Sequence, residues 1–325
     1  MMLVKEICGG FIEDEILQIS SIDEGHINDT FLVKTDDDKY ICQRVRKAMD
    51  ISILEENYLL YSEALTKAGL LYPVWRMNRD GRYFCTDQQG ENWRVYPYIE
   101  GEFLAPPLSE KELLSCGRGL ARLHKAFQAV TSMPTAVCPS LHNLSYYYDR
   151  YLQARSYLAQ NPKNADDCVG TRNASIETEL DSRIAGILEL EIDRSYVVHG
   201  DAKLANILFE DGEVKAFVDL DNVMRGSLLE DIADCIRSSC IIDGKLDKAS
   251  YEILVKGYLS IDSGLVSSDE IRILPRVTEK ICFELALRYY TDCLSEHKVF
   301  KEKYPGSLLE RARRNLAISR YAVEL

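Results

Sequence analysis

The sequence predicts an α+β protein of two lobes, a small β-rich lobe over residues 1–97 and a larger, mainly helical lobe over residues 98–325. Two observations lead to this division. Short apolar runs separated by polar turns fill the first part of the chain, whereas long segments with helical periodicity dominate from Ser109 onward. A chain of 325 residues is long enough to form two lobes of ordinary size.

The small lobe is expected to contain strands and one helix. A polar run at residues 36–39 separates two short apolar runs, which is typical of a hairpin, and Asp80-Gly81 is a second turn signal. The elements expected are strands around residues 31–33 and 40–42, a helix over residues 51–68 and further strands over residues 74–95.

The large lobe begins with a helix whose start and buried face are both predicted. Ser109 and Glu112 form a candidate capping box. The apolar residues that follow are three and four apart, and therefore lie on one helical face: Leu113, Cys116, Leu120, Leu123 and Phe127. Further helices are expected over residues 231–240, 250–260, 269–294 with a break at Pro275, and 307–322, with a loop over residues 161–175. Apolar runs at residues 195–198, 207–209 and 214–218 predict one β insertion.

Charge and cysteine usage exclude several classes of protein. The formal net charge is −13 without a basic cluster, so no nucleic-acid partner is expected. The ten cysteines are scattered without Cys-x-x-Cys pairs, which indicates reduced thiols rather than a disulfide framework or zinc site. The N-terminus lacks the apolar core of a signal peptide and no run of 18 apolar residues occurs, so a cytoplasmic protein without a membrane partner is expected.

The chemistry is predicted from residues on the β insertion. Within VVHGDAKLANILF (residues 197–209), Asp201 and Asn206 lie five residues apart on a loop that follows a strand, and Asp219 follows the next hairpin. Phosphoryl transfer needs a carboxylate to position and deprotonate the attacking hydroxyl, and an amide oxygen and second carboxylate to hold Mg²⁺. Asp201, Asn206 and Asp219 match these roles in that order. The alternative is that they cap a turn and end a strand.

This block resembles the aminoglycoside phosphotransferase and choline kinase superfamily, whose fold is protein-kinase-like, and it matches the protein-kinase catalytic loop. The resemblance implies ATP and Mg²⁺ as cofactors and places Lys203 near the transferred γ-phosphate. It makes His199 a scaffold of the loop. Asp221 is left with two roles, a second magnesium ligand or a hydrogen-bond acceptor for backbone.

Residues 229–239 (LEDIADCIRSS) resemble the helix that follows the metal-binding segment in these kinases. The resemblance implies that Asp231, Asp234 and Arg237 make buried polar contacts that fix the catalytic loop. His124 matches a recurring position of the family and is expected to be a core histidine with its hydrogen bonds satisfied.

Three further segments, residues 25–35, 39–45 and 91–101, are similar to N-acetylhexosamine 1-kinases, which phosphorylate the anomeric hydroxyl of N-acetylglucosamine and N-acetylgalactosamine. The resemblance implies a turn over the ATP phosphates and a hinge that binds adenine. The residues assigned to the turn are His26, Asn28, Asp29 and Thr30, and those assigned to the hinge are Tyr98, Ile99 and Glu100. An ordinary polar hairpin is the alternative for the turn.

The strand that carries a phosphate-binding lysine in most kinases of this fold offers Gln43 and Arg44 instead. Neighbouring strand residues point to opposite faces, so only one of the two is predicted to contact the nucleotide. Glu55 or Glu56 is the candidate partner if Arg44 faces inward.

Residues 285–300 (LALRYYTDCLSEHKVF) resemble a segment of N-acetylhexosamine 1-kinases in which an arginine and an aspartate lie near the sugar. Arg288 and Asp292 occupy the matching positions, with a surface ion pair as the alternative. Cys293 and the pair at 296–297 depart from the family pattern and put the sugar identity in question. The rival functions are a kinase for an amino alcohol or aminoglycoside, and a nucleotide-binding pseudokinase.

Overall fold

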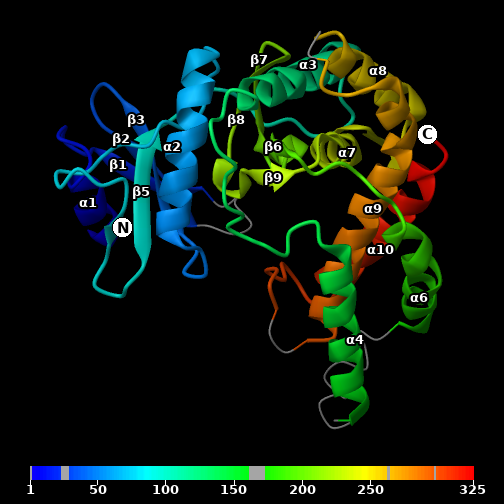
Figure 1. The fold of residues 1–325 in the computed structure, drawn as a ribbon. Coiled ribbons are helices and arrows are strands. Elements are labelled where there is room, and N and C mark those ends of the chain that lie inside the picture. Colours follow the sequence, from blue (N-terminus) through cyan, green and yellow to red (C-terminus); the bar gives the residue numbers. More distant parts are fainter. Residues whose placement is uncertain (1, 23–28, 161–172, 262–263, 296–297) are drawn as a thin grey trace.

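The computed structural model describes residues 2–22, 29–160, 173–261, 264–295 and 298–325. An antiparallel sheet forms most of the small lobe and helices form most of the large lobe, with helix α2 (Ile51–Lys67) lying between them (Figure 1). The predicted α+β class, with a β-rich first lobe and a mainly helical second lobe, is confirmed. The last strand of the small lobe ends at Pro97, and the lobe boundary after residue 97 stays a prediction.

The sheet of the small lobe is antiparallel, with the described strands in the order β1-β2-β3-β5-β4. Its alternation creates two faces. Cys42 and Val95 pack against helix α1 in an apolar cluster, whereas Ile41 and Gln43 face a cavity that is also lined by the large lobe. The remaining elements of this lobe are α1 (Met2–Gly9), β1 (Gln18–Ile22), β2 (Asp29–Lys34), β3 (Lys39–Val45), β4 (Cys85–Thr86) and β5 (Asn92–Pro97).

Residues 74–84 do not form the strand that the sequence predicts, since β4 begins only at Cys85. The backbone N–H of Trp75 donates to the Tyr58 hydroxyl at 3.1 Å, so a side chain of α2 takes the place of a strand partner. The next N–H, that of Arg76, donates to the Val95 oxygen at 2.8 Å. This segment therefore runs beside β5 as irregular chain, held by single contacts.

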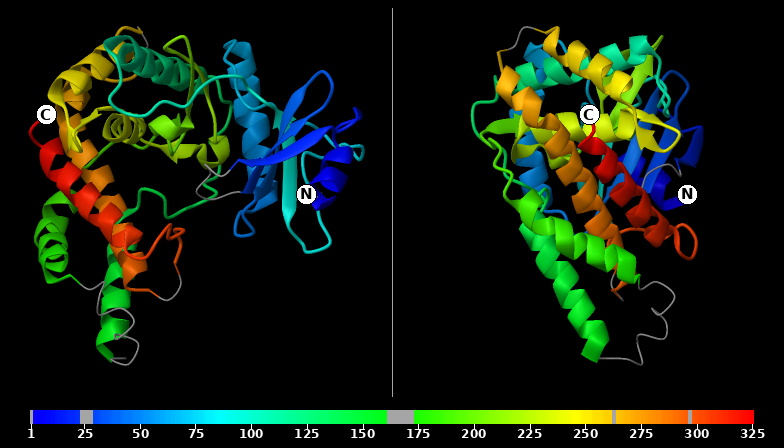
Figure 2. Two further views of the ribbon diagram at one scale, coloured as in Figure 1. Left: turned by 180° about the vertical axis from the view of Figure 1, so that it is seen from behind. Right: turned by 90° about the vertical axis from the view of Figure 1, so that its right-hand side faces the viewer.

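The large lobe is built on helices that cross at close range (Figure 2). Helices α3 and α8 meet at two glycines: a Cβ at Gly117 would lie 2.1 Å from the Leu254 oxygen, and one at Gly257 would lie 2.3 Å from the Leu114 oxygen. Only glycine permits this backbone approach. The helices are α3 (Glu110–Phe127), α4 (Leu144–Gln160), α6 (Ala174–Leu188), α7 (Leu228–Ser239), α8 (Lys248–Leu259), α9 (Ser268–Cys293) and α10 (Ser307–Ala322).

The predicted β insertion is confirmed as two short antiparallel pairs, β6 with β9 and β7 with β8. The hairpin between β7 and β8 turns at Asp211 and Gly212, both with positive φ. The strands of this lobe are β6 (Tyr196–Val198), β7 (Ile207–Glu210), β8 (Glu213–Phe217), β9 (Met224–Gly226), β10 (Ile241–Ile242) and β11 (Lys245–Leu246).

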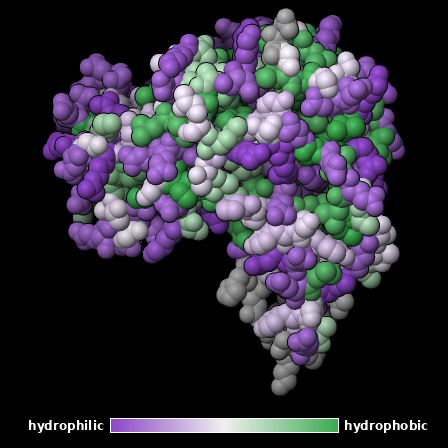
Figure 3. Space-filling model, viewed as in Figure 1, coloured by the Kyte–Doolittle hydropathy of each residue, from purple (hydrophilic) through white to green (hydrophobic). Residues whose placement is uncertain are grey.

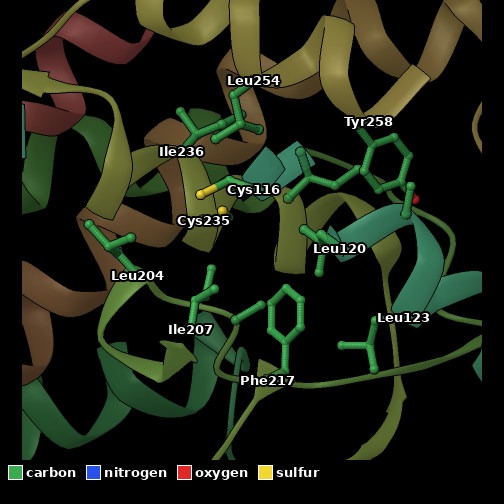
Figure 4. Packing of buried hydrophobic residues seen from close by; sticks show 14 of the residues in the cluster. Cys116, Leu120, Leu123, Leu204, Ile207, Phe217, Cys235, Ile236, Leu254 and Tyr258 are labelled. Atoms are coloured by element: carbon green, nitrogen blue, oxygen red, sulfur yellow. The ribbon is translucent and has the colours of Figure 1, made fainter. Parts of the chain in front are cut away.

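Helix α3 starts and packs as its sequence predicts. Ser109 Oγ accepts from the Glu112 N–H at 3.4 Å, and Glu112 Oε2 accepts from the Ser109 N–H at 2.7 Å, which confirms the capping box. All five residues of the predicted face are buried. Figure 4 shows Cys116, Leu120 and Leu123 converging with side chains from the β insertion and from α7 and α8. This core joins the helices to the elements that carry the predicted chemistry.

The predicted break at Pro275 is wrong, because α9 continues through it. A proline inside a helix removes one backbone hydrogen bond. The helix nevertheless buries Leu274 and Val277 on either side of the proline, and this packing maintains it. The predicted loop at residues 161–175 lies mostly outside the described residues, and α6 begins at Ala174.

The surface seen in Figure 3 is largely hydrophilic over the outer parts of both lobes. In the described part of the chain, no helix combines the length and the hydropathy needed to cross a membrane. The nine cysteines that the structure describes are free thiols, as the sequence predicts for them.

Candidate active site

The loop that carries Asp201 leaves strand β6 through a turn that requires glycine. Gly200 has φ of +79°, and a Cβ there would lie 2.5 Å from the backbone oxygen of Asn222. The backbone N–H groups of His199 and Gly200 donate to the buried Asp231 carboxylate at 2.7 and 2.9 Å. The position of the loop is therefore fixed from helix α7, which confirms the scaffold role predicted for Asp231.

Two buried histidines support this loop. The Nε2 atom of His199 lies 3.0 Å from the Val218 oxygen, and thereby links the loop to the end of β8. His124 lies between the Tyr258 hydroxyl and Asp231, at 2.8 and 3.0 Å. Both rings are engaged in the core by these contacts, as predicted.

Asp201 is held by two neighbours from its own loop. Lys203 Nζ donates to Asp201 Oδ2 at 2.6 Å, and Asn206 Nδ2 donates to the backbone oxygen and to Oδ2 of Asp201 at 2.8 and 3.1 Å. Burial alone would raise the pKa of Asp201, but Lys203, His199 and Arg237 together hold the pKa below its usual value. Asp201 is therefore an ionised carboxylate in a fixed orientation, as a proton acceptor must be.

Asp219 lies where the chain turns out of β8, in a left-handed backbone conformation with φ of 60°. The backbone oxygen of Asn206 accepts from the Val218 N–H at 2.9 Å, which brings Asn206 and Asp219 side by side. Burial, together with the charges of Asp221 and Asp201, raises the pKa of Asp219 to about 6. A bound cation would stabilise the ionised form of such a carboxylate.

The donor set fits a magnesium ion. Within the described residues, no three His, Cys, Asp or Glu side chains converge as metal ligands. Kinase-type magnesium sites, however, are held by one or two carboxylates and completed by phosphate oxygens and water. The Nδ2 atom of Asn206 donates to Asp201, so its side-chain oxygen remains available to a cation. The buried carboxylate of Asp219, whose pKa is raised, lies beside it.

A cavity of about 310 Å³ opens between the sheet and this loop. Gln43 and Thr30 line it from the sheet, and Lys203, Asn206 and Asp219 line it from the large lobe. Its apolar walls include Ile41, Tyr96, Phe103, Leu104 and Leu208. A pocket with apolar walls on one side and the amide of Asn206 and carboxylate of Asp219 on the other suits a nucleotide.

Gln43 and Arg44 lie on opposite faces of β3, as alternation requires. Gln43 faces the cavity, whereas Arg44 is paired with Asp29 and is half-exposed. Arg44 does not face inward, so the condition on which Glu55 or Glu56 would be its partner is not met. Contact of Gln43 with the nucleotide stays a prediction.

Sequence reasoning missed Arg94, a 3% exposed arginine on β5. Its Nη1 and Nη2 atoms donate to Oδ1 and Oδ2 of Asp221 at 2.6 and 2.8 Å, and its Nε and Nη2 atoms donate to Gln43 Oε1 at 3.0 and 2.6 Å. In this structure Asp221 thus accepts from an arginine rather than from backbone. One arginine within the apolar strand NWRVYP was the available signal.

The predicted adenine-binding segment lies at the cavity. Tyr98 and Ile99 line it, whereas the exposed Glu100 carboxylate pairs with Lys39 at 2.6 Å. The N–H of Tyr98 is engaged with the Lys39 oxygen at 2.9 Å. In the predicted phosphate turn, His26 and Asn28 lie outside the described residues, and Thr30 borders the cavity.

Comparison with known proteins identifies the family. Residues 18–262 match the model of the phosphotransferase enzyme family. The chain belongs to this family. It is therefore a phosphotransferase of the type that transfers phosphate to an alcohol group.

Solved structures with the same fold include the microcompartment-associated aminopropanol kinase, with 18% identity and a TM-score of 0.69 over 100% of this chain and 95% of that one. The amicoumacin kinase hAmiN, solved in complex with AMP-PNP, Ca²⁺ and Ami, has 12% identity and a TM-score of 0.67 over 98% and 93% of the two chains. The choline kinase LicA from Streptococcus pneumoniae has 14% identity and a TM-score of 0.63 over 100% and 98%. These similarities show the kinase-like fold of the phosphotransferase.

The two residues predicted to bind the acceptor do not pair with each other in the phosphotransferase. The guanidinium carbon of Arg288 lies 4.7 Å from the ring centre of Tyr147 and 5.2 Å from that of Phe300. Asp292 is 5% exposed, and its Oδ2 accepts from the N–H groups of Val299 and Phe300 at 2.8 and 2.7 Å. Asp292 thus holds the backbone at Val299 and Phe300, and Phe300 in turn contacts Arg288. The alternative, a surface ion pair between Arg288 and Asp292, is not observed.

Proposed function

We propose that the phosphotransferase uses Mg²⁺-bound ATP to phosphorylate the anomeric hydroxyl of an N-acetylhexosamine, with ADP and the sugar 1-phosphate as products. The observation that carries the kinase chemistry is the Asp201 carboxylate, held in place by Lys203 and Asn206, two residues that line the nucleotide-sized cavity. The sugar acceptor rests on the sequence resemblance of residues 25–35 and 285–300 to N-acetylhexosamine 1-kinases. The proposal includes a cytoplasmic location, where ATP is available.

The transfer follows from what each side chain can do. The anomeric hydroxyl is the most acidic hydroxyl of a sugar, so one carboxylate base, Asp201, is sufficient to orient it and accept its proton. Lys203 lies at 2.6 Å from that carboxylate and lines the cavity, so its ammonium can move to a γ-phosphate oxygen. Asn206 and Asp219 would hold Mg²⁺, which neutralises charge on the phosphates when bound. Catalysis is then mainly positioning and electrostatic stabilisation.

The acceptor would be held on the helical lobe. Arg288 is kept in place by the rings of Tyr147 and Phe300, and it lies 3.7 Å from the buried Glu284. An arginine fixed in this way can donate to sugar hydroxyl or acetamide oxygens without losing much side-chain entropy. Asp292 contributes by holding the backbone before Phe300. Arg288→Ala should therefore raise the KM for the sugar at least about tenfold while the KM for ATP stays within about twofold.

A panel of sugars and amino alcohols tests the acceptor. Each compound is incubated with ATP and Mg²⁺, and products are detected by mass spectrometry, with the Asp201→Asn variant as the control for contaminating kinases. The expected product is acid-labile, and its phosphorus couples to the anomeric proton in NMR. An acid-stable 6-phosphate, or turnover of amino alcohols alone, would refute the anomeric assignment and leave the phosphotransferase assignment intact.

An amino alcohol is the second candidate acceptor, favoured by two buried carboxylates. Among the described residues, Asp234 Oδ2 and Glu284 Oε2 have no hydrogen-bond partner, although the side chains are 3% and 1% exposed. Burial is the main cause that raises the pKa of both groups. Each carboxylate already lies beside an arginine, Asp234 beside Arg237 and Glu284 beside Arg288, so the second oxygen of each remains for an ammonium group. This chemistry is in keeping with the aminopropanol kinase and choline kinase among the solved structures, and the same panel decides between the candidates.

A further inference from the structure

Gln43 occupies the strand position where a lysine is expected, and it brings no charge. The cation at this place comes from the next strand. Gln43 and Arg94 are directly opposite in the register of β3 and β5, so both side chains lie on the face that lines the cavity. The guanidinium is further positioned 4.7 Å from the ring centre of Trp75.

The partner of this cation is on the other lobe. In kinases that carry the strand lysine, its carboxylate partner is a glutamate of the following helix. Here the partner is Asp221, two residues after Asp219 on the segment that follows β8, and the pair is bidentate. Both side chains are 3% exposed. The ion pair therefore ties the sheet directly to the segment predicted to hold the metal.

Arg94 also determines the orientation of the Gln43 side-chain amide. A guanidinium has only donors, so the Gln43 oxygen must turn toward it, and Nε and Nη2 of Arg94 donate to that oxygen at 3.0 and 2.6 Å. The Gln43 amide nitrogen is then directed away from Arg94, toward the Thr30 hydroxyl at 3.5 Å. The N–H₂ group is thereby presented beside the predicted phosphate turn.

We propose that Arg94 is the positioning residue of the nucleotide site: it replaces the strand lysine from the neighbouring strand, holds Asp221 as its partner rather than as a metal ligand, and orients Gln43 as a donor to the phosphates. The inference rests on the proposed function for the identity of the ligand, a nucleoside triphosphate or diphosphate with its magnesium. It does not depend on the acceptor.

Nucleotide binding itself is the readout, and it needs no acceptor. Trp75 lines the cavity and is one of two tryptophans, so its fluorescence can follow titration with ADP at fixed Mg²⁺, with calorimetry as a second measurement. Arg94→Ala should weaken Mg·ADP binding at least about tenfold, the loss expected for charge-assisted hydrogen bonds. Arg94→Lys should recover part of it. Arg183→Ala, which removes a partly buried ion pair to Glu279 in the helical lobe, is the matched control and should stay within about twofold.

Two further variants separate positioning from folding. The double variant Arg94→Met, Asp221→Leu replaces the pair by apolar side chains of similar volume, which commonly preserves stability. Its melting temperature should lie within a few degrees of that of the wild type. It should nevertheless bind Mg·ADP as weakly as Arg94→Ala. Asp221→Asn leaves a carbonyl acceptor for Arg94 and should change the Mg²⁺ concentration for half-maximal binding by less than about threefold.

Each outcome has one meaning. Wild-type affinity in Arg94→Ala, or in the Met/Leu double variant, overturns the positioning role. Loss of Mg²⁺ dependence in Asp221→Asn to the same extent as in Asp219→Ala makes Asp221 a metal ligand and also overturns the proposal. Failure of the wild-type protein to bind any nucleotide would refute the proposed kinase function, which is a different result from either.

Discussion

Removal of the Asp231 carboxylate should destabilise the loop that carries Asp201, because it removes the hydrogen bonds that hold this loop to helix α7. Oδ1 of Asp231 accepts from the Gly200 N–H at 2.9 Å, and Oδ2 accepts from the His199 N–H at 2.7 Å and lies 3.0 Å from His124 Nε2. The side chain is 1% exposed, so water cannot replace it in the intact structure. Asp231→Ala leaves three buried polar groups without their partner.

The expected cost follows from these contacts. Breaking a buried charged network by removing one partner costs about 3–5 kcal/mol. An unfolding entropy of about 2.1 cal/mol/K per residue gives roughly 0.7 kcal/mol/K for a chain of this length, so the melting temperature should fall by about 4–7 °C. Because the loop also carries Asp201, kcat should fall with it. Asp231→Asn should lose less stability and less kcat than Asp231→Ala but remain less stable than the wild type, because its amide NH₂ would face one of the N–H donors.

Differential scanning calorimetry and steady-state kinetics measure the two effects. Asp37→Ala, at an exposed aspartate of the turn between β2 and β3, is the control and should change stability by less than about 0.5 kcal/mol. If Asp231→Ala melts within about 1 °C of the wild type and keeps its kcat, the reasoning that this carboxylate holds the loop is wrong.

Three more predictions concern the site itself. Asp201→Asn should lower kcat by about 10²–10⁴ with ADP affinity unchanged, and turnover close to wild type would exclude Asp201 as the base. Gly200→Ala, at φ of +79° and 2.5 Å from the Asn222 oxygen, should cost about 1–2 kcal/mol from the backbone alone and more from the clash, as measured by urea unfolding. The raised pKa of Asp219, about 6 in the native state, predicts two opposite pH effects. Its proton is bound more tightly in the native than in the unfolded state, so unliganded stability rises as pH falls from 7 toward about 4, whereas Mg²⁺-dependent ADP binding weakens below pH 6 because the ligand must be ionised. Melting curves with and without Mg·ADP check both, and Asp219→Asn should abolish them.

Local features were predictable because neighbours along the chain determine them. The capping box at Ser109, the buried face of α3 and the strand-loop-strand block around Asp201 and Asn206 depend on spacings of three to five residues. Such spacings fix relative positions once the backbone is helical or turns tightly. Strand alternation likewise predicted that Gln43 and Arg44 would lie on different faces.

The tertiary structure alone decided which groups meet across the lobes. Asp221 had two predicted roles, and its contact with Arg94 joins residues 127 positions apart in the chain. Residues 74–84 lost their predicted strand because the Tyr58 hydroxyl from α2 takes the N–H of Trp75, and α9 continues through Pro275 because its buried face maintains it. Spacing and periodicity determine the direction in which a side chain points, but the packing of the lobes determines what it meets there. The sequence by itself therefore determined the phosphotransferase motif, and the fold determined how its charges are held.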